Sequence, residues 1–341
     1  MNIVLLAVLA VGIWGIGLRK DNAYLSKEQT GAINGFFVLL VFLRHTVDYI
    51  TLGPWDGIFG AINAHLDQLI VVPFLFYSGY GIMCSIRRKG QNYVSALPRD
   101  RLFKVWYHFA VAVALYLVLA LCIGKKYGAI RIALSFTGWD SIGNSNWYIF
   151  ATICMYLFTW LSFTVFRKDH RLASAALMAL SVGYILIMRQ LKGIWWYDTA
   201  LVYPAGVVYG LYREKIETLL QKKLFLPWLA LSTCGAAFLL CFKLQNGLVW
   251  REGMAVAFAL TVLCATMVFK IGNPVLVFLG KFTFEIYILQ RIPMILLKDL
   301  FQNQYVYLAV SFCLTLLLAI AFRKLLDLTD ALIYKKGGKP A

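Results

Sequence analysis

Residues 31–51 read GAINGFFVLLVFLRHTVDYIT, and this stretch is apolar and long enough to cross a bilayer. A membrane helix needs about 20 residues to cross about 30 Å of hydrocarbon. The stretch also carries three ionisable residues, namely Arg44, His45 and Asp48. An Arg or Asp at membrane depth costs at least about 2.5 kcal/mol on insertion scales, so such residues usually serve a function. The segment therefore predicts both a membrane-spanning helix and a functional site within it.

The composition of the whole chain also indicates a membrane protein. Of its 341 residues, 61% are hydrophobic and only 14% are charged, whereas a soluble domain has about 45–50% apolar and about 25% charged residues. Apolar residues cluster into eleven expected spans: 2–18, 31–51, 66–85, 105–124, 147–166, 172–188, 198–212, 224–242, 253–269, 274–297 and 305–322. We therefore expect an all-α polytopic membrane protein embedded in the lipid bilayer.

The basic residues alternate between the two sides of these spans. The formal net charge is +17, but the loops expected on one side carry 22 Lys and Arg residues and those on the other side carry 8. Loops rich in Lys and Arg stay in the cytoplasm. The pattern predicts a multi-pass protein of the cell membrane with its N-terminus outside and its C-terminus in the cytoplasm. This topology accounts for the positive net charge of the chain, so we expect no nucleic-acid partner.

The spacing of polar residues in 31–51 suits proton transfer. Asn34 and His45 are eleven residues apart, which is three helical turns plus about 20°, so both project from one face about 16 Å apart along the axis. Asp48 follows His45 by three residues and shares that face. A carboxylate near an imidazole can fix its tautomer and raise its basicity, which makes His45 a candidate general base. The alternative is a structural hydrogen-bond network between helices.

The most basic part of the chain follows the third span. It reads RRKG at 87–90 and RDRLFK at 99–104. A cluster of this kind suits the phosphates of a nucleotide-like donor. Positive-inside topology and contact with anionic lipid headgroups are the explanation that composition alone favours. No glycine-rich phosphate loop accompanies the cluster, and the seven Cys residues show no metal-ligand spacing, so we expect no metal site.

Two further segments carry candidate residues. Trp147 and Tyr148 begin a span after a polar loop, where they could anchor the helix at the membrane interface or stack on a sugar. The segment LGKFTFEIYILQR at 279–291 places Glu285 and Gln290 at membrane depth. Glu285 could pair with Lys281 one turn earlier, or both polar residues could face a functional interior.

Taken in this order, the segments resemble the integral membrane acyltransferase-3 family. The resemblance is carried by Ile33-Asn34-Gly35 through His45, Ser78-Gly79-Tyr80, Arg101 with Lys104, Trp147-Tyr148, Tyr203-Pro204-Ala205-Gly206, Leu279-Gly280 and Tyr287-Ile288-Leu289-Gln290. It covers residues 28–322 as a ten-helix bundle, which leaves 1–27 as an extra N-terminal transmembrane helix with an inner loop and 323–341 as a basic cytoplasmic tail. Three residues depart from the family pattern: Asn34 and Lys104 stand where the family has Arg, and Gln290 stands where it has a late His.

The resemblance implies a membrane-bound O-acyltransferase. It would transfer an acyl group, usually acetyl, from cytoplasmic acyl-CoA to a hydroxyl of a cell-surface or lipid-linked carbohydrate, with acyl-CoA as co-substrate and no bound cofactor. His45 would be the general base and Asp48 would orient it, while Arg44 or Asn34 would stabilise the oxyanion. The remaining assignments are acyl-CoA binding by Arg88, Arg99, Arg101 and Lys104, acceptor binding by Trp147 and Tyr148, and substrate positioning by Glu285 and Gln290.

Other interpretations stay open at this point. Ionisable residues at membrane depth also suit a transporter or flippase for an acidic metabolite or glycan, although the sequence shows no inverted repeat. The three departures also fit a catalytically weakened relative that serves in a complex. Exopolysaccharide, peptidoglycan, a teichoic-type polymer and a small hydroxylated compound are all compatible acceptors.

Overall fold

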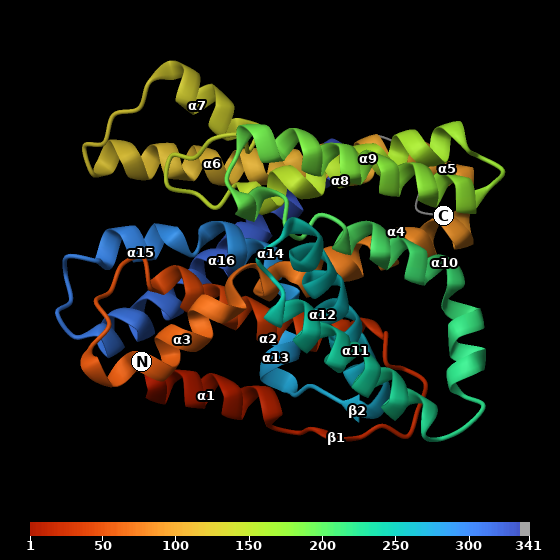
Figure 1. Cartoon of the computed structure of the whole chain (residues 1–341). Helices are drawn as coiled ribbons and strands as arrows, with labels where there is room; N and C mark the ends of the chain where they lie inside the picture. The colour runs from red at the N-terminus through yellow and green to blue at the C-terminus, as the bar shows by residue number, and fades with distance from the viewer. Residues whose placement is uncertain (335–341) are drawn as a thin grey trace.

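The computed structural model describes residues 1–334, and most of them lie in helices (Figure 1). Within these residues, seven helical segments are long and apolar enough to cross a membrane: Pro54–Lys89, Gln91–Cys122, Trp147–Val165, His170–Leu191, Leu226–Lys243, Leu248–Val268 and Gln304–Tyr334. In the same part of the chain, strand structure is limited to the two-residue pair β1 (Gly17–Leu18) and β2 (Phe269–Lys270). The prediction of an all-α polytopic membrane protein is confirmed.

The α-helices of the described residues fall into two groups along the sequence. The first group is α1 (Asn2–Ile13), α2 (Lys27–Thr46), α3 (Gly57–Leu66), α4 (Val72–Lys89), α5 (Gln91–Leu97), α6 (Lys104–Cys122), α7 (Ala129–Phe136) and α8 (Trp147–Val165). The second group is α9 (His170–Leu191), α10 (Val202–Leu220), α11 (Leu226–Lys243), α12 (Leu248–Val268), α13 (Pro274–Lys281), α14 (Thr283–Leu289), α15 (Arg291–Leu297) and α16 (Gln304–Tyr334). Short turns of helix lie at η1 (Pro54–Asp56), η2 (Asp67–Val71), η3 (Pro98–Phe103) and η4 (Ile194–Trp196).

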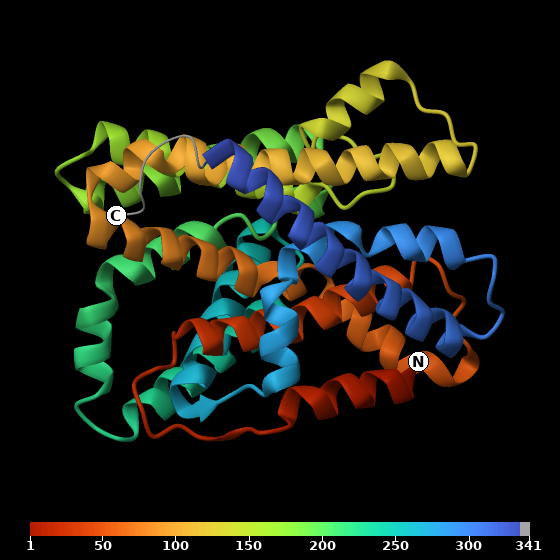
Figure 2. The ribbon, with the colours of Figure 1, turned by 180° about the vertical axis from the view of Figure 1, so that it is seen from behind.

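The helices form two layers, and the two ends of the molecule differ in the residues that they carry. Helices α5 to α9 form a layer along one side of the molecule, and the remaining helices lie on the other side (Figures 1 and 2). We call the end where α4 finishes and α5 and η3 follow the basic end, because it carries Arg87–Lys89 and Arg99–Lys104. We call the end where α2 finishes and α4, α8 and α10 begin the cavity end.

Glycines bring two pairs of helices into unusually close contact. A methyl group at Gly79 of α4 would overlap the carbonyl oxygen of Tyr203 on α10, and one at Gly206 of α10 would overlap that of Phe76 on α4. Gly35 of α2 meets the backbone of α13 in the same way. In membranes, where apolar burial does not drive helix association, such small residues let backbones pack closely. The α4–α10 and α2–α13 pairs are among the three most extensive helix contacts.

Several segments differ from the sequence-based expectation. The span predicted at 274–297 is three short helices, α13 to α15. Pro293 lacks the N–H that would bond to the carbonyl of Leu289, so α14 cannot continue unbroken through this position. The loop predicted before Trp147 contains α7, and α1 is a 12-residue helix rather than a span reaching residue 18.

The predicted tail at 323–341 begins as helix, because α16 continues to Tyr334. The remainder of that tail, residues 335–341, lies outside the described residues.

Candidate active site

A cavity of about 510 Å³ opens at the cavity end. Five parts of the chain line it. The lining residues are Val41, Arg44 and His45 of α2, with Asp48 just after it; Asp67, Gln68, Ile70 and Val71 of η2; Ser145 and Asn146 before α8, with Trp147 at its start; Ile194 and Trp195 of η4; and Tyr287 of α14 with Arg291 of α15. Three predicted site residues of α2 and the following turn therefore share one cavity with Trp147.

His45 lies half-buried in the wall of this cavity. Its Nδ1 is buried and has no hydrogen-bond partner within the described residues. The Tyr287 ring lies 6.3 Å from the imidazole between centroids, and the Gln290 amide lies next to the imidazole. Most buried polar atoms in folded proteins are hydrogen-bonded, so an unpartnered buried nitrogen on a residue that lines a cavity needs an explanation.

Asp48 does not contact the imidazole that it was predicted to orient. Its carboxylate accepts a hydrogen bond of 2.5 Å from Arg291 and lies 3.6 Å from the guanidinium of Arg44. Arg291 also donates to the hydroxyl of Tyr49 over 3.1 Å. Arg44 and Arg291 thus meet at Asp48, and two cations with one carboxylate leave this part of the cavity positively charged.

Arg291 was not predicted from the sequence as a site residue. A charged side chain directly after Gln290, within the same apolar segment, was the signal that could have identified it. Folding brings this segment against the end of α2, and only that contact shows that Arg291 and Arg44 flank one carboxylate.

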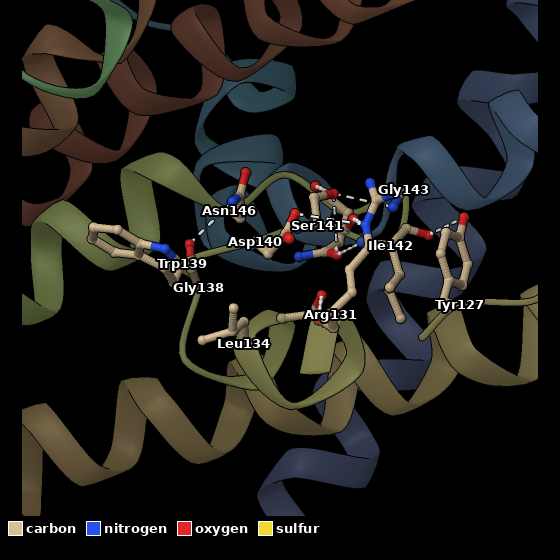
Figure 3. A network of polar contacts seen from close by, with 12 residues as sticks. Tyr127, Arg131, Leu134, Gly138, Trp139, Asp140, Ser141, Ile142, Gly143 and Asn146 are labelled. Atoms are coloured by element: carbon tan, nitrogen blue, oxygen red, sulfur yellow. Dashed lines mark hydrogen bonds and ion pairs between the residues drawn. The ribbon is translucent and has the colours of Figure 1, made fainter. Parts of the chain in front are cut away.

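The loop before α8 is held in place by its own hydrogen bonds (Figure 3). The Asn146 amide donates to the Gly138 carbonyl over 3.0 Å, and the Ser141 hydroxyl donates to the Asn144 carbonyl over 2.6 Å. Arg131 of α7 donates to the Ser141 carbonyl over 2.9 Å. These bonds fix the wall that presents Trp147 to the cavity. Its neighbour Tyr148 does not line the cavity.

Behind Tyr148 lies a row of tyrosines that leads toward the basic end. The rings of Tyr287 and Tyr148 are 5.2 Å apart. Two turns further along α8, the Tyr156 hydroxyl lies 2.8 Å from the Ser78 hydroxyl. The hydroxyls of Tyr287 and Tyr77 are buried and have no partner within residues 1–334. A buried hydroxyl without a partner lowers stability by about 1–3 kcal/mol. The hydroxyls of Tyr287 and Tyr77 can therefore bind polar groups of another molecule.

Asn34 lies on the basic side of His45. The two residues are eleven positions apart on α2, so about 16 Å of helix separates them. The side-chain oxygen of Asn34 is also buried without a partner in the described chain. Asn34 therefore does not share the His45 cavity.

The four basic residues predicted to bind acyl-CoA lie at the basic end, in different settings. Arg88 is exposed, Arg99 lies 5.1 Å above the Tyr334 ring, and Arg101 donates to the Tyr93 hydroxyl over 3.1 Å. Lys104 forms an ion pair of 2.5 Å with Asp330 of α16. The charge of Lys104 is therefore already partnered, whereas the other three cations form no ion pair with a carboxylate within residues 1–334.

Glu285 lies apart from the cavity. It is 2% exposed and forms a 2.6 Å ion pair with Arg323 of α16. Arg323 also donates to the carbonyl of Lys281. The contact is structural, since it joins α14 to α16 on the basic side of the cavity.

These observations define a polytopic membrane protein with a histidine-containing cavity at one end and a cationic cluster at the other. A family model described as an acyltransferase domain matches residues 32–324, which is most of the chain. The chain therefore belongs to the acyltransferase-3 family, as the sequence motifs predicted, and it is a membrane acyltransferase. No curated protein and no solved structure matches the chain.

Proposed function

We propose that the protein transfers an acyl group, most simply acetyl, from cytoplasmic acyl-CoA to a hydroxyl of a cell-surface or lipid-linked carbohydrate. The observation that carries this proposal is the unpartnered Nδ1 of His45 beside a cavity that contains two arginines. Membership of the acyltransferase family supports the reaction class. The excess of Lys and Arg at the basic end supports a cytoplasmic location for that end, which puts the N-terminus and the cavity outside.

His45 acts as the general base in this mechanism. It takes the proton from the acceptor hydroxyl as the oxygen attacks the thioester carbonyl. The tetrahedral intermediate carries a negative charge on the former carbonyl oxygen, and Arg44 stabilises it from the cavity wall. Collapse of the intermediate breaks the carbon–sulfur bond, and the imidazolium returns its proton to the leaving CoA thiolate. The ester product and free CoA result.

The polar groups between the two ends support a route for the donor. CoA carries its phosphates at its nucleotide end, and a long pantetheine arm with two amides joins them to the thioester. Arg88, Arg99 and Arg101 can bind the phosphates at the basic end, because none of the three forms an ion pair with a carboxylate within residues 1–334. The unpartnered side chains of Asn34 and Tyr77 can then bind polar groups of the arm on its way to His45.

Aromatic side chains at the mouth of the cavity support a carbohydrate acceptor. Trp147 and Trp195 both line the cavity, and Trp195 is 48% exposed. Indole rings provide a broad apolar face and a donor N–H, which suits the mixed surface of a sugar. Trp147 was predicted for this role from sequence, whereas Trp195 was not.

The substitution His45→Ala tests the proposal. Membrane vesicles from cells that express each variant are incubated with radiolabelled acetyl-CoA, and the label bound covalently to an acceptor is counted. We expect His45→Ala to lose label by at least about a hundredfold, while His170→Ala, a change at the basic end of α9, keeps it. Wild-type turnover in a folded His45→Ala protein would exclude His45 from the mechanism. Accumulation of unmodified glycan without covalent label would favour the transporter instead.

A further inference from the structure

A separate cavity of about 440 Å³ lies beside the end of α10, and it shares no lining residue with the His45 cavity. Its walls are the segment between β1 and α2, the last turn of α10, the α10–α11 turn, the start of α11 and the end of α12 (Figure 1). Arg87 at the end of α4 pairs with Glu214 of α10 over 2.7 Å, which puts this part of α10 at the basic end. The volume is in the range of about 300–1,000 Å³ that is typical of ligand pockets.

Both carboxylates that line this cavity are already paired. Asp21 accepts a hydrogen bond of 2.6 Å from its neighbour Arg19. The carboxylate of Glu217 accepts from Arg213 over 2.6 Å, and the Tyr24 hydroxyl donates to the same oxygen over 2.7 Å. Each carboxylate therefore has a guanidinium partner, and neither leaves net negative charge in the cavity. Within the described residues, no histidine lines the cavity.

Two lysines carry the charge that remains. Lys20 lies between β1 and α2, Lys223 lies on the α10–α11 turn, and both are exposed. Neither forms an ion pair within residues 1–334. The ammonium of Lys223 lies 5.9 Å from the centre of the Phe225 ring, a contact that leaves its positive charge in place. The cavity therefore has two cations that no carboxylate of the described chain neutralises.

Exposed apolar side chains lie next to these lysines. Leu224 is 92% exposed, Phe225 is 54% exposed and Trp228 is 44% exposed. Leu220 and Met267 line the cavity itself. In a membrane protein, apolar side chains of this kind contact acyl chains, and tryptophans gather at the level of the headgroups. The cavity therefore combines cations for a phosphate with an apolar border for hydrocarbon.

We propose that this cavity binds the headgroup of an anionic glycerophospholipid. Lys20 and Lys223 donate to the phosphate, and an acyl chain lies against Leu224. The amides of Asn22 and Gln221, which also line the cavity, donate to the remaining headgroup oxygens. Basic pockets between membrane helices on the cytoplasmic side bind lipid headgroups in this way, and the cytoplasm is the side that the proposed orientation gives to the basic end. A bound lipid joins the segment before α2 to the α10–α11 turn.

Binding of a fluorescent phosphatidylglycerol to the purified protein in neutral detergent tests the proposal. A lysine at a membrane surface favours anionic lipid about fivefold in affinity, so Lys20→Gln and Lys223→Gln should each raise the Kd about fivefold and the double variant about 25-fold. Lys222 is exposed on the same turn but does not line the cavity, so Lys222→Gln should leave the Kd unchanged. An equal rise for Lys222→Gln would show a general attraction of the basic surface for anionic lipid and overturn the proposal.

The thermal midpoint without lipid is the control for folding. Lys20 and Lys223 are exposed and form no ion pair within the described chain, so both variants should keep the wild-type midpoint. A lower midpoint would make the lysines structural residues and contradict a role in lipid binding.

Competition by unlabelled molecules identifies the occupant. Phosphatidylglycerol should displace the fluorescent lipid, whereas phosphatidylcholine with the same chains, glycerol 3-phosphate and acetyl-CoA should not do so at the same concentration. Displacement by phosphatidylcholine would assign binding to the acyl chains, displacement by glycerol 3-phosphate would indicate a site for a soluble phosphate, and displacement by acetyl-CoA would make the cavity part of the donor site. Each of these results would overturn the assignment. The measurement is of binding alone, so its result does not depend on the proposed acyl transfer.

Discussion

The close contact between α4 and α10 makes a sharp prediction about stability. A methyl group at Gly79 would lie 3.1 Å from the Tyr203 carbonyl carbon and 3.2 Å from the Val207 nitrogen, and it would overlap the Tyr203 oxygen. These are backbone atoms, so a side-chain rotation cannot relieve the overlap, and the helices must separate by roughly 1 Å. Overpacking of this kind costs about 3 kcal/mol at its upper end. The better helix propensity of Ala returns about 1 kcal/mol, so Gly79→Ala should destabilise the protein by about 2 kcal/mol.

Gly81 offers a control on the same helix. It lies two residues further along α4, and an added methyl group there would meet nothing within 4 Å. Gly81→Ala should be neutral or stabilising by up to about 1 kcal/mol. Thermal unfolding of both variants in detergent, followed by tryptophan fluorescence, should separate their midpoints by about 3–4 °C. Equal midpoints would contradict the inference that Gly79 is needed for the backbone contact between α4 and α10.

Four further substitutions test the site and its supports. Arg101→Ala should raise the KM for acyl-CoA about tenfold in the vesicle assay, and Lys104→Ala should raise it less, because Asp330 already neutralises Lys104; a larger effect for Lys104→Ala would contradict this. Glu285→Gln should lower the thermal midpoint by the equivalent of about 1–2 kcal/mol and leave the KM for acyl-CoA unchanged, so a changed KM would place Glu285 in the donor site. Asp48→Asn should reduce kcat less than His45→Ala and leave the pH profile of kcat in place, since Asp48 binds arginines; a shifted profile would restore it as the partner of the imidazole.

Local sequence was sufficient for the helical class. Apolar runs of membrane length identify spans without any tertiary information. The close contact at Gly79 and Gly206 was not predicted, because small residues are common in membrane helices and only the fold shows which of them face another helix. The break within 274–297 was not predicted, since three short helices and one continuous helix have the same average hydrophobicity. Pro293 was the local signal that could have shown it.

The site was only partly predictable, for a different reason. His45 and Arg44 could be found because ionisable residues at membrane depth are conspicuous in a sequence. Asp67 lies in the short helical turn η2 and Trp195 in η4, and neither residue type marks such a turn as part of a site. They become part of the site only because η2 and η4 fold over the end of α2. The spacing of these segments along the chain does not indicate that they come together in the fold.

The position of Asn34 explains how an uncharged residue can stand where the family pattern has Arg. It stands about 16 Å from His45 on the basic side, and its oxygen has no partner in the described chain. A cation at this depth would need a carboxylate or a phosphate beside it. A neutral amide needs only a neutral donor or acceptor, such as the amide groups along the arm of CoA. In the mechanism we propose, Arg99 and Arg101 bind the phosphates at the basic end, and α2 guides the uncharged part of the donor. An Asn in place of Arg is compatible with this mechanism, because charge recognition is then expected at the basic end rather than beside Asn34.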